Sequence, residues 1–218
     1  MSERAGWFRR FLGPLGGPPW ERPSSGSERH LVLVRHGQAA AAWSDDMDPG
    51  LSDLGRRQAE AMADELASLG PLPVVASPMR RCRETAVPLE ARWGAPARVD
   101  PAVGEIVAPS DGPPGDEAAA LEARSTWLRT AMAGRWSDLG PEHQAWRTGV
   151  VDALRAMPGD AVVVTHFVAI NAAVGAATGD DRIVCFSPAN CSRTILRVDQ
   201  GGLTVLALGN DDTDTRVG

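Results

Sequence analysis

Two short, largely aliphatic runs, 31–34 and 161–165, constrain the fold more than any other feature of the sequence, because a histidine follows each of them within two residues. Both runs are rich in valine and do not alternate with charged residues, which is typical of strands buried on both faces of a parallel sheet. His36 and His166 then follow the carboxyl ends of their strands, where open parallel sheets bind ligands. If the two strands are neighbours, both imidazole rings lie in one crevice.

The rest of the chain alternates between helical and strand patterns. Ser52 is a suitable N-cap for the first helix, and Gly70 is a suitable stop. Short buried strands that alternate with helices are typical of a parallel sheet covered on both faces. We therefore predict an α/β fold, a three-layer α/β/α sandwich with a mostly parallel central sheet. The expected helices cover 56–69, 79–93, 117–133, 142–157 and 168–177, and further strands cover 74–76, 193–198 and 203–208.

Two parts of the chain are expected to lie outside the layers of this sandwich. Residues 1–29 contain apolar side chains but are interrupted by glycines and prolines, which predicts a disordered N-terminal extension without the continuous core of a signal peptide. Residues 101–158 begin with a stretch rich in proline and glycine and continue into two helical patterns. We expect them to form a helical capping insertion within a single folded domain over 30–218.

Charge and cysteine content exclude several classes of partner. The formal net charge of -6 argues against a general surface for nucleic acid or anionic membranes. No stretch approaches the roughly 20 apolar residues of a membrane span. The 3 cysteines have neither CxxC nor zinc-ligand spacing, so we expect free thiols in a reducing cytoplasm. The expected partners are small molecules or other proteins.

The chain contains no lysine. This excludes a Walker lysine, a Schiff-base lysine and pyridoxal-type catalysis. Any anion site must therefore use arginine, histidine, backbone N–H groups and helix N-termini. Residues 77–86 follow the predicted strand 74–76 and place several arginines at the start of a helix, where the dipole also favours an anion.

Four motifs occur along the chain in a fixed order. They are Leu33-Val34-Arg35-His36-Gly37, Leu51-Ser52-Asp53-Leu54-Gly55-Arg56-Arg57-Gln58-Ala59, Ser77-Pro78-Met79-Arg80-Arg81-Cys82-Arg83-Glu84-Thr85-Ala86 and Val164-Thr165-His166. Together they resemble the ordered motifs of the histidine phosphatase superfamily, also called phosphoglycerate mutase-like. The similarity runs from about residue 31 to about residue 208. Arg-His-Gly alone is a weak signal, whereas four motifs in the family's order are a specific one.

The resemblance implies a function and the centre of a site. His36 would be the nucleophile that carries the phosphoryl group, and Arg35, Arg81 and His166 would surround that group. Arg81 is the matching arginine because it is the fifth residue counted from Ser77. The implied enzyme is a phosphoric monoester hydrolase that needs no metal and no cofactor, since phosphoryl transfer depends mainly on positioning and electrostatics.

Four further residues are candidates by the same resemblance. Glu105 lies where many family members carry a catalytic glutamate, and would act as acid and base; a surface carboxylate is the alternative. Gly37 lets the backbone approach the ligand, while Gln38 is either a phosphate contact or an exposed amide. Phe167 stands where a glycine often follows the second histidine, so its ring either walls the substrate pocket or packs beneath it. The Trp-Glu-Gly sequence that often follows the glutamate is absent.

The leading hypothesis is a metal-independent phosphatase that hydrolyses phosphomonoesters through a phosphohistidine on His36. A phosphoglycerate-mutase-type phosphotransferase is less favoured, because Gln38, Ala39 and Ala40 stand where mutases tend to carry serine and asparagine. A phosphoprotein or phosphohistidine phosphatase is a third reading, and a zinc hydrolase lacks a close-set ligand motif. The expected partner is a phosphorylated small molecule; its identity and a homodimer are left open.

Overall fold

A mixed sheet lies at the centre of the computed structural model, which describes residues 28–41, 46, 48–108 and 117–209. Within these ranges the sheet has 6 strands in the order β3-β2-β4-β1-β5-β6. The first four strands in this order run parallel, and β5 and β6 are antiparallel to their neighbours. The strands are β1 (Arg29–Arg35), β2 (Val74–Ala76), β3 (Arg98–Val99), β4 (Ala161–Thr165), β5 (Arg193–Asp199) and β6 (Gly202–Ala207).

The two strands that lead to histidines are neighbours, which meets the condition for both imidazole rings to share one crevice. β1 and β4 pair in parallel, with Val34 opposite Val164 and Arg35 opposite Thr165. The His36 N–H donates to the Thr165 carbonyl at 3.0 Å, which extends the pairing past the end of β1. Both histidines therefore leave the sheet at the same edge.

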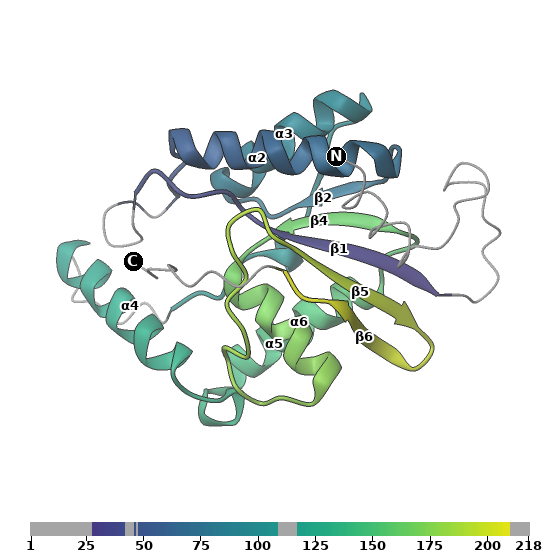
Figure 1. Cartoon of the computed structure of the whole chain (residues 1–218). Helices are drawn as coiled ribbons and strands as arrows, with labels where there is room; N and C mark the ends of the chain where they lie inside the picture. The colour runs from purple at the N-terminus through teal and green to yellow at the C-terminus, as the bar shows by residue number, and fades with distance from the viewer. Residues whose placement is uncertain (1–27, 42–45, 47, 109–116, 210–218) are drawn as a thin grey trace.

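Helices cover both faces of the sheet, which confirms the three-layer α/β/α sandwich. Figure 1 shows α2 and α3 on one side and α5 and α6 on the other, while α4 stands away from the sheet. No helix among the described residues is long and apolar enough to cross a membrane. The helices are α2 (Asp53–Leu66), α3 (Arg80–Trp93), α4 (Glu117–Met132), α5 (Pro141–Arg155) and α6 (Phe167–Thr178).

The core consists of two apolar layers separated by the sheet. Val32 and Val34 pack with residues of α2 and α3, whereas Leu31 and Leu33 pack with residues of α5 and α6. Because side chains alternate along a strand, a run of four aliphatic residues supplies both layers. This confirms that the first strand is buried on both faces.

Several boundaries differ from the prediction. α2 begins at Asp53, capped by the Ser52 hydroxyl as expected, and ends at Leu66; the turn that follows it, up to Gly70, is a 3₁₀ helix. Strand β3 was not predicted, because it has only 2 residues and both are exposed. β1 begins at Arg29, the last residue of the expected N-terminal extension; residues 1–27 of that extension lie outside the described residues.

Gly55, in the first turn of α2, allows this helix to lie close to the backbone that follows β1. A Cβ atom at Gly55 would overlap the Gln38 carbonyl oxygen, and one at Gly37 would lie 2.6 Å from the Gly55 carbonyl oxygen. The first turn of α2 thus lies directly against the backbone that follows β1. A glycine inside the helix permits this contact, even though glycine has a low helix propensity.

Substituting two helical glycines should therefore give opposite results. Gly55→Ala is expected to lower the free energy of unfolding by about 1–3 kcal/mol, because the new methyl group displaces the loop after β1. Gly149→Ala, in α5 where no atom lies within 4 Å of the new Cβ, should raise it by about 0.5–1 kcal/mol. Urea unfolding of both variants measures the difference, and stabilisation by Gly55→Ala would show that the contact is absent.

Candidate active site

His36 lies immediately after β1 and is only 8% exposed. Its Nδ1 atom is 2.8 Å from the Gly37 carbonyl oxygen, and its Nε2 atom is 3.2 Å from Nε of Arg81. A carbonyl only accepts and a guanidinium only donates, so Nδ1 carries the proton and Nε2 holds the lone pair. Burial, followed by the charge of Arg81, lowers the pKa of His36 from 6.5 to about 3. The ring is therefore neutral at physiological pH.

Arg81 joins His36 to the second histidine. It lies in the first turn of α3, is 1% exposed, and places Nη2 at 3.2 Å from Nδ1 of His166. His166 Nδ1 must accept this bond, so Nε2 carries the proton and donates to the Ser77 hydroxyl at 2.7 Å. The two imidazole centroids are 5.2 Å apart. The crevice expected between β1 and β4 therefore contains both rings and a buried guanidinium.

Burial lowers the pKa of His166 well below its ordinary value, and the neighbouring His36 and Arg81 lower it further. Both rings are then neutral while the arginine is charged. A pair of neutral imidazoles beside a fixed cation is suited to nucleophilic attack on an anionic substrate.

Arg35, the last residue of β1, is held from two sides. Its Nη1 atom donates to the Pro188 carbonyl at 2.8 Å, and its guanidinium carbon is 5.1 Å from the centroid of the Phe167 ring. Phe167 is the first residue of α6 and is only 7% exposed. The ring therefore packs against the Arg35 guanidinium, and its role as a wall of the substrate pocket stays a prediction.

Glu105 is half-buried and follows the 3₁₀ turn Pro101–Val103. Its carboxylate accepts from the backbone N–H groups of Ile106 at 3.0 Å and Val168 at 3.2 Å. Burial raises the pKa of this carboxyl group from 4.5 to about 7, although the two N–H groups and the charges of the site arginines act in the opposite direction. Glu105 can therefore both give and take a proton near neutral pH.

Gly37 and Gln38 have different environments. The Gly37 N–H donates to the Thr85 hydroxyl at 3.0 Å, and Thr85 in turn donates to the Arg81 carbonyl at 2.7 Å. Gln38 is exposed, and its side-chain oxygen accepts from the Ser52 hydroxyl at 2.8 Å. Gly37 is thus integrated into the site, whereas the Gln38 side chain contacts the cap of α2.

Three supporting residues received no individual role from the sequence. Ser77 accepts from His166, Thr85 links Gly37 to Arg81, and the Asn190 side chain donates to the His36 carbonyl at 2.8 Å. A signal existed for Thr85, because it follows Arg81 by four residues and so lies on the same face of a helix. Asn190 follows the last helix in a turn, and nothing in its spacing indicates contact with His36.

One of the three cysteines lies beside the second site histidine. Cys82, Cys185 and Cys191 are free thiols, as expected. Burial raises the pKa of Cys82, which packs beside His166, above its ordinary range. Across the described ranges, no three side chains of histidine, cysteine, aspartate or glutamate gather as a metal site.

The fold and site define an α/β enzyme that presents two buried histidines and two arginines, one of them buried, at the carboxyl edge of its sheet. The profile of the histidine phosphatase superfamily (branch 1) matches residues 31–211, and the chain belongs to this superfamily. Together with its relatives, this membership identifies the chain as a phosphatase.

Comparisons with known proteins agree with this membership. Glucosyl-3-phosphoglycerate phosphatase of Mycolicibacterium vanbaalenii is 37% identical over 169 residues, which cover 72% of this chain and 67% of that protein. A structure of mycobacterial glucosyl-3-phosphoglycerate phosphatase in complex with VO3 has a TM-score of 0.61 at 26% identity and covers 84% of this chain and 100% of that one. YhfR of Bacillus stearothermophilus shares the fold, with a TM-score of 0.65 at 18% identity over 84% of this chain and 98% of that one.

Proposed function

We propose that this phosphatase hydrolyses phosphomonoesters in two steps through a phosphohistidine on His36. In the first step Nε2 attacks phosphorus, the bond to the ester oxygen breaks, and Glu105 gives its proton to the leaving oxygen. In the second step water attacks phosphorus, the Glu105 carboxylate takes a proton from that water, and the bond to Nε2 breaks. Inorganic phosphate leaves, and both residues return to their starting states.

One observation carries this proposal: the Gly37 carbonyl holds the proton of His36 on Nδ1, so that the lone pair of Nε2 points toward Arg81. An imidazole held in this tautomer is ready to attack, and the adjacent guanidinium attracts the phosphoryl oxygens. We assign Arg35, Arg81 and His166 to the developing negative charge on these oxygens. No step requires a metal, so we propose metal-independent turnover.

The proposed substrate is a small phosphorylated metabolite. The relatives named glucosyl-3-phosphoglycerate phosphatase make glucosyl-3-phosphoglycerate the first compound to test. We assign the selection of the organic group to the capping insertion, 101–158; the last turns of α4 pack against Ile106 and Phe167, beside the site. Cytoplasmic location and a homodimer stay predictions.

Trapping the intermediate tests the proposal. Acid-quenching is unsuitable for a phosphohistidine, so the enzyme is mixed with labelled substrate and quenched in base. We expect label on the protein that is stable in base and lost in acid, a burst of the alcohol product, and the same turnover in EDTA. Absence of labelled protein during a detectable burst would contradict the phosphohistidine route. A requirement for added bisphosphoglycerate would instead favour the mutase reading, and preference for phosphohistidine peptides would favour the third.

A further inference from the structure

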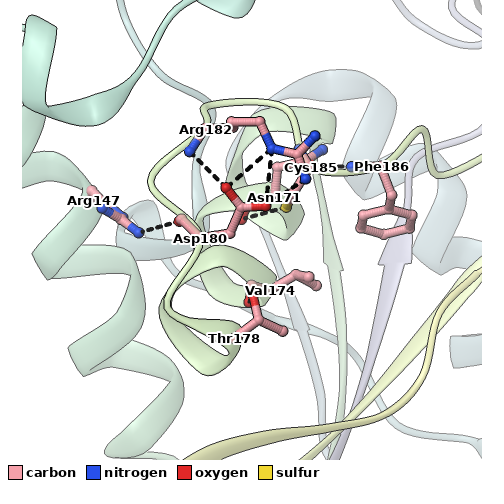
Figure 2. A network of polar contacts seen from close by, with 8 residues as sticks. All are labelled: Arg147, Asn171, Val174, Thr178, Asp180, Arg182, Cys185 and Phe186. Atoms are coloured by element: carbon pink, nitrogen blue, oxygen red, sulfur yellow. Dashed lines mark hydrogen bonds and ion pairs between the residues drawn. The ribbon is translucent and has the colours of Figure 1, made fainter.

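Asn171 is a fully buried polar residue in α6 whose side-chain nitrogen and oxygen are both hydrogen-bonded. Its Nδ2 donates to the Phe167 carbonyl at 3.0 Å. Its Oδ1 accepts from the backbone N–H groups of Cys185 at 2.8 Å and Phe186 at 3.1 Å, and from the Cys185 thiol at 3.2 Å. Figure 2 shows this side chain between α6 and the segment that carries Cys185 and Phe186. Asn171 therefore fixes that segment to the helix.

The segment then continues to the phosphate-binding end of β1. We call residues 185–192 the strap. Within it, the Pro188 carbonyl accepts from Arg35 Nη1 at 2.8 Å, and the Cys191 N–H donates to the Arg35 carbonyl at 2.9 Å. Cys191 adopts a left-handed conformation with φ of 56°. The strap thus holds both the backbone and the guanidinium of Arg35.

Asn171 also contacts the second support of Arg35. The Phe167 ring packs against the guanidinium, and the carbonyl of the same residue accepts the Asn171 amide. One buried side chain therefore bonds both to the residue whose ring packs against the guanidinium and to the segment that carries Pro188. A salt bridge would not do this equally well, because a neutral amide can accept and donate at once without a desolvated charge.

We propose that Asn171 is a positioning residue for Arg35, acting through Phe167 and the strap. The inference rests on the proposed function in one respect, that Arg35 binds the phosphoryl group. Two parallel N–H···O bonds to a phosphoryl group require the guanidinium plane to be set in advance, and a small displacement of a binding group is costly. The flexible stem of an arginine does not set that plane, whereas a carbonyl that accepts from Nη1 and a ring packed against the guanidinium restrict it.

A double-mutant cycle tests this role with inorganic phosphate as the probe, measured by isothermal titration without turnover. Asn171→Leu keeps the size of the side chain and removes its hydrogen bonds, and we expect the Kd for phosphate to rise about tenfold. In an Arg35→Ala background the same change should alter Kd by less than about twofold, because two residues that act through one contact are not additive. A structural defect unrelated to Arg35 would be additive.

Two further variants keep the test decisive. Asp181 lies between α6 and the strap and accepts from the Ser137 hydroxyl at 2.7 Å. Asp181→Asn weakens this contact and should leave the Kd for phosphate unchanged. If Asn171→Leu does not fold, Asn171→Asp keeps the acceptor for the strap and loses the donor to Phe167, and must show the same dependence on Arg35. Normal phosphate affinity in a folded Asn171 variant, or an equal loss in both backgrounds, would overturn the inference. Failure to trap phosphohistidine would leave this binding result intact and remove only the proposed mechanism.

Discussion

Replacement of His36 by alanine is expected to lower kcat/KM by at least about 10,000-fold, because the variant lacks the atom that accepts the phosphoryl group. Arg35, Arg81 and His166 remain in place, so the variant should still bind inorganic phosphate. His36→Gln should be equally inactive, since an amide nitrogen has no lone pair available for attack. Steady-state kinetics with a nitrophenyl phosphate, combined with the trapping of labelled protein, measures both effects.

A matched control lies on the same strand. His30 is near the start of β1, at the opposite end from His36, and its N–H donates to Asp160 at 2.8 Å. His30→Gln should leave kcat/KM within about twofold, as expected for a position away from the reacting atoms. EDTA-resistant activity in His36→Ala within about tenfold of the wild type would show that another group is the nucleophile.

The pH dependence of stability provides an independent check on His36. The pKa of this ring is about 3 in the folded state and lies near 6.5 in the unfolded state. Below about pH 6.5 the unfolded state therefore binds more protons, and the contribution of His36 to the free energy of unfolding falls as the pH is lowered. His36→Ala should lose this term and become less sensitive to acid than the wild type, as measured by urea unfolding at pH 5 and pH 7.

Strand chemistry predicts that both histidines leave the sheet at the same edge, whereas the pairing of β1 with β4 depends on the strand order. Runs such as Leu31 to Val34 must be buried on both faces, and parallel neighbours place their carboxyl ends at one edge. The contact between Gly55 and the Gln38 carbonyl could not be predicted, because it joins the first turn of α2 to backbone from another part of the chain. The spacing of apolar residues identifies the buried face of a helix, but it does not show where another backbone segment approaches that helix closely.

The protonation states of the two site histidines, and the hydrogen bonds that hold the site residues, could not be predicted from the sequence either. Which nitrogen of His166 carries the proton depends on Ser77 and Arg81, which belong to a different strand end and helix. Asn171 lies in a helix that is otherwise almost entirely apolar, and its partners in the strap are 14 and 15 residues away. Motif order located the charged residues, whereas rotamers and long-range hydrogen bonds determined how they are oriented.

Replacement of Glu105 by glutamine is expected to lower kcat/KM by about 100- to 10,000-fold for an alkyl phosphate, the usual range for removal of a general acid. The loss should be much smaller for a nitrophenyl phosphate, because a nitrophenolate leaves without being protonated. Glu60→Gln is the matched control, since Glu60 lies on α2 and pairs with Arg92 at 2.9 Å. Equal losses on both substrates would remove Glu105 from the acid role.

The raised pKa of Glu105 predicts that Glu105→Gln loses activity but gains stability relative to the wild type. Because the carboxyl group titrates near pH 7, kcat/KM of the wild type for an alkyl phosphate should fall as the pH rises through 7, and this limb should be absent in Glu105→Gln.

Between about pH 4.5 and 7 the folded state binds more protons than the unfolded state, so the contribution of Glu105 to stability falls as the pH rises and stays low above 7. Glu105→Gln should therefore gain stability relative to the wild type from pH 5 to pH 8. A carboxylate on the surface would produce neither the activity limb nor the gain, so the two measurements together separate a catalytic acid from an ordinary loop residue.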